Sequence, residues 1–212
     1  MSAILFLFFK TFVGFLAVMD PVGAIPIVIG MTPHNTEEER RRMILRACII
    51  ACIVLLFFGA TRMWLFSFFG FTLAAFKLAG GLVLLLLSFD MLNAKETTSK
   101  NSTAEENEGY AKADISITPL AIPLLSGPAM ITTVILAFGD APDATHTVIV
   151  LVATLAVCLA SWLILRAGTA ISHCLGATGI KIVTRTMGML LASMSIQFCA
   201  DGLLQLFPGW GT

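Results

Sequence analysis

Long apolar runs alternate with short polar stretches along the whole chain. A helix needs roughly 20 mostly apolar residues to cross the hydrocarbon core of a bilayer, which is about 30 Å thick. The runs that meet this requirement cover residues 3–31, 47–66, 74–92, 116–138, 147–167 and 186–206. The pattern therefore predicts an all-α membrane protein with six transmembrane helices.

The composition agrees with a protein that lies in a lipid bilayer. Of the 212 residues, 58% are hydrophobic and 12% are charged. Soluble domains are usually about 45–50% apolar and about 25% charged. The formal net charge is zero, so nothing indicates nucleic acid as a partner.

Polar residues dominate the stretch 93–114, which reads "NAKETTSKNSTAEENEGYAKAD". Such a segment cannot bury enough apolar surface to form a core, so we expect a solvated, flexible linker. It divides the chain into a first three-helix unit, residues 1–92, and a second three-helix unit, residues 115–212.

Lysine and arginine are distributed unevenly among the predicted loops. The first loop, the linker and the fifth loop region together hold ten, whereas the other side has two, Arg62 and Lys77. Because positive loops stay in the cytoplasm, the linker is expected to be cytoplasmic. Both termini are then extracytoplasmic, with the protein in the cytoplasmic (inner) membrane of a bacterium or archaeon.

Two landmarks of the first unit recur in the second. "DPVGAIP" in the first span matches "GPAMITT" in the fourth, with Pro21 and Pro128 107 residues apart. Gly80 in the third span and Gly188 in the sixth are 108 residues apart. Each unit holds an odd number of spans, so the second copy must enter the membrane in the opposite orientation. Such inverted repeats are typical of secondary transporters, where Gly/Pro-interrupted helices mark the binding site.

The matched motifs carry residues that end one helix and begin another. Proline lacks an N–H group but suits the first position of a helix, so Asp20 is expected to be the N-cap before Pro21, with Ser126-Gly127 in that place before Pro128. Helices 1 and 4 are predicted to be broken near the midplane, with free N–H groups at the start of each second half. A substrate carboxylate could bind there. The alternatives are proline kinks that only shape helix packing, or re-entrant hairpins.

Asp20 is the one acidic residue inside an interrupted span. A charged Asp at the centre of a membrane costs about 2.5–3.5 kcal/mol on insertion scales, and intramembrane ionisable groups are usually functional. Asp20 is therefore a candidate for ion coupling, through a bound cation or an exchanged proton. The alternative is a purely structural helix cap.

The other candidates are polar or small residues close to the two breaks. Thr132 could offer its hydroxyl to a ligand or bond back to its own helix, and Gln197 could line a pocket or join two helices. The predicted substrate-binding residues are Asp20, Pro21, Gly23, Ser126, Gly127, Pro128, Thr132 and Gln197.

The spans contain no arrangement typical of an enzyme. Neither a Ser/His pair, nor paired carboxylates, nor a His/Glu metal motif is present, and the five cysteines lack converging metal ligands. We therefore expect no enzymatic activity, no cofactor and no metal. No motif identifies a subunit interface, so a homo-oligomeric state stays open.

Four stretches in order resemble the MarC family of bacterial and archaeal membrane proteins. They are "DPVGAIPI", "FKLAGGLVLLLLSFDML", "PLAIPLLSGPAMITTVIL" and "TRTMGMLLASMSIQF", and the resemblance extends over nearly the whole chain. The family usually has Asn where this sequence has Asp20, and Gly where it has Ala129. Members belong to a lysine-exporter-like superfamily of six-span transporters, and some transport small neutral amino acids such as glycine and alanine.

The resemblance supports Asp20, Pro21, Gly23, Gly127 and Pro128 as site residues. Together with the repeat, it predicts a secondary transporter of small neutral amino acids that works by alternating access. Coupling to protons or sodium is one possibility, and the alternative is an uncoupled channel or facilitator for small polar solutes.

Overall fold

The computed structural model describes residues 2–32, 35–93 and 124–208, and within them all regular structure is helical. The helices are α1 (Ser2–Met19), α2 (Pro21–Met31), α3 (Glu37–Phe69), α4 (Leu73–Leu92), α6 (Pro128–Gly139), α7 (Ala144–Arg166) and α8 (Gly168–Leu206). By length and composition, five helical segments of the described chain could cross a membrane, and α6 is a shorter apolar helix. An all-α membrane protein is thus confirmed. The predicted linker, from residue 94 onward, and the start of the predicted fourth span lie outside the described residues.

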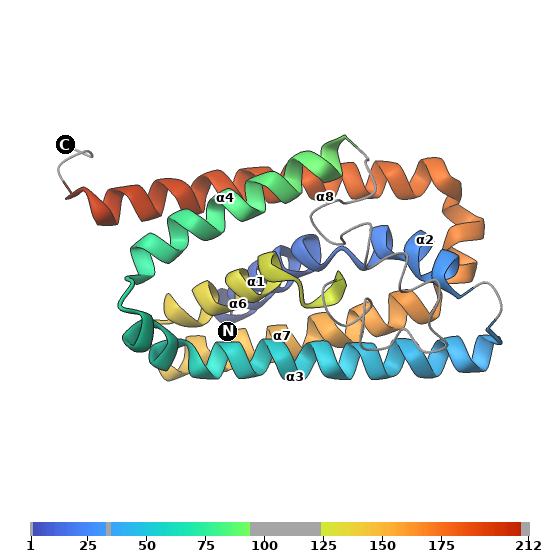
Figure 1. The fold of residues 1–212 in the computed structure, drawn as a ribbon, viewed down its shortest axis with the longest axis horizontal. Coiled ribbons are helices and arrows are strands. Elements are labelled where there is room, and N and C mark those ends of the chain that lie inside the picture. The colour runs from blue at the N-terminus through green and yellow to red at the C-terminus, as the bar shows by residue number, and fades with distance from the viewer. Residues whose placement is uncertain (1, 33–34, 94–123, 209–212) are drawn as a thin grey trace.

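The helices form three layers. α4 packs along α8 on one side and α3 packs along α7 on the other, with α1, α2 and α6 between them (Figure 1). The largest fully buried side chains accordingly include Phe15 and Met19 of α1, Ile25 of α2, and Met130 and Leu136 of α6. The residues nearest the two proline motifs therefore lie at the centre of the molecule.

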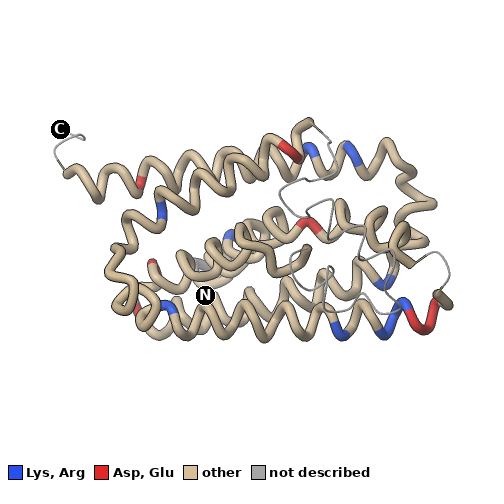
Figure 2. The backbone as a smooth tube through the Cα atoms, in the orientation of Figure 1, with Lys and Arg blue, Asp and Glu red and all other residues tan. Residues whose placement is uncertain are grey.

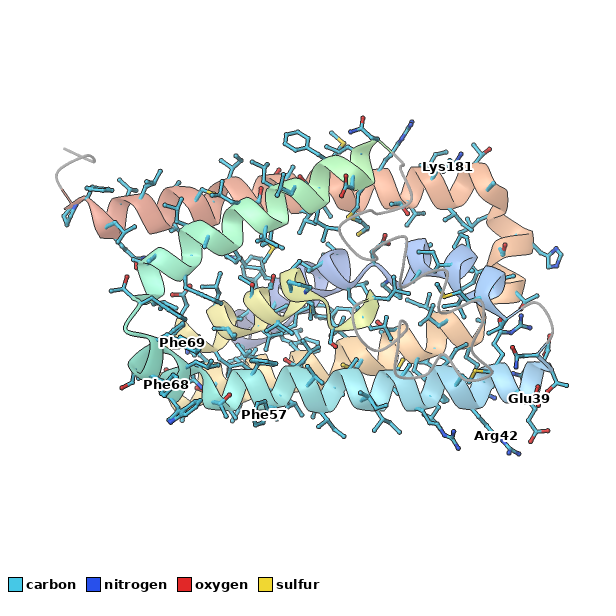
Figure 3. All side chains as sticks on the ribbon, in the orientation of Figure 1. Glu39, Arg42, Phe57, Phe68, Phe69 and Lys181 are labelled. Atoms are coloured by element: carbon cyan, nitrogen blue, oxygen red, sulfur yellow. The ribbon has the colours of Figure 1, made fainter. Side chains whose placement is uncertain are left out.

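The outer face of α3 shows how the molecule meets lipid. Its first turns carry exposed charges and its far end carries exposed aromatic rings, with Glu39 and Arg42 at one end and Phe68 and Phe69 at the other (Figure 3). Charged residues are sparse between the helix ends (Figure 2). Exposed apolar side chains such as these phenylalanines cost little in hydrocarbon, and the ring of Trp, as at the exposed Trp64, favours the membrane interface. This surface fits a bilayer better than water.

Helix α3 begins ten residues before the predicted second span. Thr36 and Glu39 form a capping box, in which the Glu39 N–H donates to the Thr36 hydroxyl at 3.3 Å and the Thr36 N–H donates to the Glu39 carboxylate at 2.9 Å. These two bonds satisfy backbone donors at the helix start. The hydrophobic run marked the apolar part of this helix, but the cap determined where the helix begins.

The fifth predicted loop is wrong for residues 168–185, which are helical. α8 runs over Gly168–Leu206, with one non-helical residue, Gly176, at φ 61° and ψ 179°. Glycine adopts a positive φ without steric cost, so the chain bends there and continues as helix. A polar stretch between two apolar runs predicts a loop, but polar residues also form exposed helices, as they do here.

Small residues allow α4 and α8 to approach closely. A Cβ atom on Gly81 would lie 2.8 Å from the Ser195 carbonyl oxygen and 2.6 Å from the Cys199 sulfur. A Cβ on Gly202 would lie 2.9 Å from the Ala74 carbonyl oxygen. Such contacts require glycine, as in other close helix pairs in membranes.

We expect Gly81→Ala to destabilise the protein because the added methyl group would press on the α8 backbone. Overpacking of this kind costs about 1–3 kcal/mol, against a helix-propensity gain of about 1 kcal/mol. Gly14→Ala is the matched control, because its Cβ would lie 3.4 Å from the end of the Met194 side chain. Thermal unfolding in detergent should give a lower midpoint for Gly81→Ala than for Gly14→Ala. Equal midpoints would contradict the close packing of α4 on α8.

Candidate functional site

Asp20 interrupts the first apolar segment. α1 ends at Met19 and α2 begins at Pro21, and Asp20 between them has φ 42° and ψ 63°. It is the only non-glycine residue with a positive φ in the described chain, a conformation for which Asp and Asn are enriched. Its side chain accepts a hydrogen bond from the Gly23 N–H at 3.1 Å. The sequence-predicted N-cap before Pro21 is present in the structure.

The Asp20 carboxylate is buried deeply for an ionisable group. The residue is 4% exposed, and it caps a helix whose N-terminal end carries partial positive charge. A Cβ on Gly23 would overlap this carboxylate and lie 3.0 Å from the Thr184 hydroxyl of α8. Gly23 is therefore needed for the carboxylate to fold over the start of α2 and for α2 to pack on α8.

The second motif begins α6 in a different way. Pro128 is the first residue of the helix, and Gly127 before it is extended, at φ −63° and ψ 169°, with no side-chain cap. Ser126 is 1% exposed. Gly127 therefore has no side chain to accept a hydrogen bond from the first N–H groups of α6, whereas Asp20 accepts one from the Gly23 N–H of α2.

The remaining predicted residues are separated by the structure. Thr132 is half-buried and meets α4, because a Cβ on Gly80 would overlap its methyl group. Gln197 is exposed on α8 and donates a hydrogen bond to Asp201 at 2.7 Å. Gln197 therefore neither lines a described cavity nor joins two helices, and we leave it outside the site. Its polarity alone did not indicate which face of α8 it occupies.

Two cavities lie at opposite ends of the helix bundle. The first, which we call the Lys10 cavity, has a volume of about 210 Å³ and is lined by α1, α6, α7 and α8, including Val150. The second, the Arg40 cavity, has a volume of about 180 Å³ and is lined by α2, α3, α7 and α8, including Leu165. At 1.5 Å per residue, these two residues are about 22 Å apart along α7.

The interruption at Asp20 lies between these cavities along the chain. Phe15 of α1 lines the Lys10 cavity, and Ile25 of α2 lines the Arg40 cavity. Both side chains are 1% exposed, as is Met19 between them. Asp20 is therefore buried in the stretch of α1 and α2 that runs from one cavity to the other.

The Lys10 cavity contains groups of both charges. Lys10, Asp140 and His146 line it, together with the threonines at positions 11 and 133. The Asp140 carboxylate also lies 2.6 Å from the Lys77 ammonium, whose side chain is only 6% exposed. Although Lys77 counts toward the extracytoplasmic side in the distribution of charge, it lies buried within α4. The position of this lysine inside an apolar run could have indicated a buried ion pair, because a buried ammonium requires a charged partner.

Asp143 lies beside this cavity, where it caps α7. It accepts a hydrogen bond from the His146 N–H at 2.8 Å, and the His146 ring lies 2.6 Å away. These hydrogen bonds hold the pKa of the Asp143 carboxyl below its ordinary value. The cap fixes the start of α7 at the rim of the cavity.

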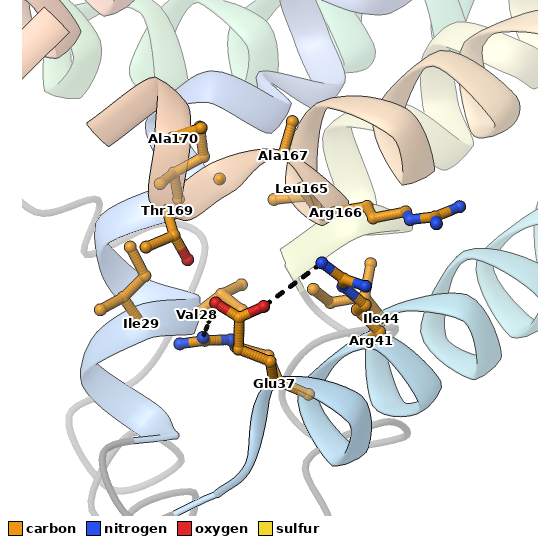
Figure 4. A pocket seen from close by; sticks show the side chains of 13 residues that line it. Val28, Ile29, Glu37, Arg41, Ile44, Leu165, Arg166, Ala167, Thr169 and Ala170 are labelled. Atoms are coloured by element: carbon orange, nitrogen blue, oxygen red, sulfur yellow. Dashed lines mark hydrogen bonds and ion pairs between the residues drawn. The ribbon is translucent and has the colours of Figure 1, made fainter. Parts of the chain in front are cut away.

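The Arg40 cavity is lined by a basic cluster. Of the described lining residues, Arg40 and Arg41 of α3 and Arg166 of α7 are basic and Glu37 is the one carboxylate. Figure 4 shows the Glu37 carboxylate between α3 and the start of α8, joined to two guanidinium groups. In the described part of the chain, no group of three or more His, Cys, Asp or Glu side chains could hold a metal ion.

The fold and the buried interruption define a multi-pass helical membrane protein with a polar break inside its first apolar segment. The chain belongs to the MarC family of integral membrane proteins, whose family model matches residues 5–207. It is 35% identical to a UPF0056 membrane protein of Pyrococcus abyssi over 98% of this chain and 99% of the relative. It is 35% identical to one of Aquifex aeolicus, covering 94% of both chains, and 32% identical to YhcE of Escherichia coli, covering 95% and 94%. No solved structure matches the chain.

Proposed function

We propose that the protein is a secondary transporter of small neutral amino acids that works by alternating access. The observation that carries this proposal is the position of Asp20, a buried carboxyl at a helix interruption between two cavities at opposite ends of the bundle. Intramembrane acidic groups commonly mark substrate or ion pathways. A transporter needs such a buried site that can be reached from each side in turn.

The packing supports an inverted repeat of the two halves. α2 packs on α8 and α6 packs on α4, while α3 packs on α7 and α4 on α8. If α2, α3 and α4 correspond to α6, α7 and α8, the contact between α2 and α8 is the counterpart of the contact between α6 and α4. The contacts between α3 and α7 and between α4 and α8 are each their own counterpart. The breaks at Pro21 and Pro128 are then equivalent and lie near the bilayer midplane.

The chemistry of the breaks suits a zwitterion. The uncapped start of α6 offers backbone N–H groups to a carboxylate, and α1, which ends next to Asp20, packs against α6. The Asp20 carboxylate would meet the ammonium group or carry the coupling proton or sodium ion. The small residues Gly127 and Ala129 at the start of α6 favour a substrate with a small side chain. Ser126, buried just before Gly127, completes the proposed site.

The orientation follows from the distribution of charge. We place the Arg40 cavity on the cytoplasmic side and the Lys10 cavity and both termini on the extracytoplasmic side of the inner membrane, because positive residues are retained in the cytoplasm. The relatives come from bacteria and archaea, which have such a membrane.

Uptake of labelled glycine, alanine, serine and threonine into proteoliposomes tests this proposal. We expect saturable uptake of at least one of them, driven above equilibrium by an imposed proton or sodium gradient. Protein-free liposomes are the control. Saturable uptake that no gradient raises would indicate an uncoupled facilitator, and no uptake of any of the four would overturn the proposed substrate class.

A further inference from the structure

The Arg40 cavity carries more positive charge than its own residues neutralise. Among the described residues, three guanidinium groups line it with one carboxylate, so this part of the lining has a formal charge of two positive units. Glu37 lies 3.2 Å from Arg41 and 4.0 Å from Arg40. The guanidinium of Arg166 lies over the Trp162 ring at 5.3 Å from its centre.

Arg40 is the most enclosed of these groups. Its side chain is 17% exposed, compared with 52% for Arg41. A guanidinium has five N–H donors, and the contact between Arg40 and Glu37 is long for a charge-assisted hydrogen bond. The enclosed cation therefore has donors left for a ligand that enters the cavity.

The rest of the lining suits a small anionic group next to an apolar one. The start of α8 contributes Gly168 and Thr169, and this helix begins without a side-chain cap. Ile25, Ile29 and Ile44 provide the apolar wall. The cavity has a volume of about 180 Å³. Sites for drug-sized ligands usually have volumes of about 300–1,000 Å³, so this cavity suits a smaller group.

The geometry points to a binding site for the phosphate group of an anionic ligand, either the headgroup of an anionic phospholipid or free phosphate. We propose this site independently of the transport function. Arginine matches phosphate through paired N–H donors, and basic pockets between transmembrane helices bind anionic headgroups. Leu45 and Ile49, exposed on the next turns of α3 at 43% and 50%, provide a surface for acyl chains.

Lipid retention by the purified full-length protein tests the site. Native mass spectrometry would compare phosphatidylglycerol with phosphatidylcholine, and calorimetry in neutral detergent would measure inorganic phosphate. Each arginine near a membrane surface contributes roughly fivefold to the binding of anionic lipid. We expect Arg40→Gln/Arg166→Gln to weaken phosphatidylglycerol binding by about 25-fold. Arg42→Gln is the matched control, because Arg42 pairs with Glu38 outside the cavity.

Glu37→Gln gives a test with the opposite sign. Removing the carboxylate that Arg40 and Arg41 share frees both arginines, so anion binding should become tighter, whereas Glu38→Gln should leave it unchanged. If the double arginine variant does not fold, Glu37→Gln decides the matter alone. The same pattern with inorganic phosphate but not with phosphatidylglycerol would assign the site to a soluble anion. Equal losses in Arg42→Gln, or unchanged or weaker binding in Glu37→Gln, would overturn the proposal.

Discussion

Asp20→Asn is expected to give a folded protein that no longer accumulates amino acid against its gradient. Asparagine caps helices as well as aspartate does and also tolerates a positive φ, so the hydrogen bond to Gly23 at 3.1 Å can be kept. Only the carboxyl group can release a proton or balance the charge of a cation. The substitution therefore separates the coupling role of Asp20 from its structural role.

The expected loss is large because coupling sets the limit of accumulation. Moving one elementary charge across 100 mV is worth about 2.3 kcal/mol, which corresponds to about 50-fold accumulation of a neutral zwitterion carried with one cation. In Asp20→Asn the ratio should fall to about one, while exchange of labelled for unlabelled substrate without a gradient persists. Steady-state uptake and counterflow in the same proteoliposomes would measure the two quantities.

Asp20→Ala is the comparison that removes the cap as well as the charge. Losing an N-cap costs about 0.5–2 kcal/mol, and alanine is strained at positive φ, so its unfolding midpoint should fall below that of Asp20→Asn. Gradient-driven accumulation by Asp20→Asn at the wild-type level would show that Asp20 is only a helix cap.

Asp140→Asn is expected to lower the stability of the protein strongly. It leaves the Lys77 ammonium, whose side chain is 6% exposed, without its carboxylate 2.6 Å away. Breaking a buried pair costs about 3–5 kcal/mol. Asp140 itself is 45% exposed, and water there reduces the cost to about 2–3 kcal/mol. For a chain of this size the apparent unfolding midpoint should fall by about 4–12 °C.

Removing both charges should restore most of this stability. Lys77→Met/Asp140→Asn has no unpaired buried cation, and replacing a buried pair by apolar groups is often neutral. Glu38→Gln is the control, because it breaks the exposed pair with Arg42, whose side chains are 69% and 77% exposed, and should change the midpoint by less than about 2 °C. A midpoint for Asp140→Asn as high as that for Glu38→Gln would show that the ion pair contributes nothing.

The sequence by itself determined the features that depend on neighbouring residues. Apolar runs indicated membrane-spanning helices because burial of that length is favourable only in hydrocarbon. Asp20-Pro21 indicated an N-cap and a new helix because proline lacks the N–H group that would continue the old one.

Only the tertiary structure decided the features that depend on which helices meet. Lys77 and Asp140 are far apart in the chain, and their pairing follows from the packing of α4 on α6. Gln197 faces outward because α8 turns another face to α4, and a single helix pattern cannot reveal its neighbours. Both cavities likewise require several helices at once. Local chemistry acts over about one helical turn, whereas partners, cavities and exposure arise from packing between segments that the sequence lists far apart.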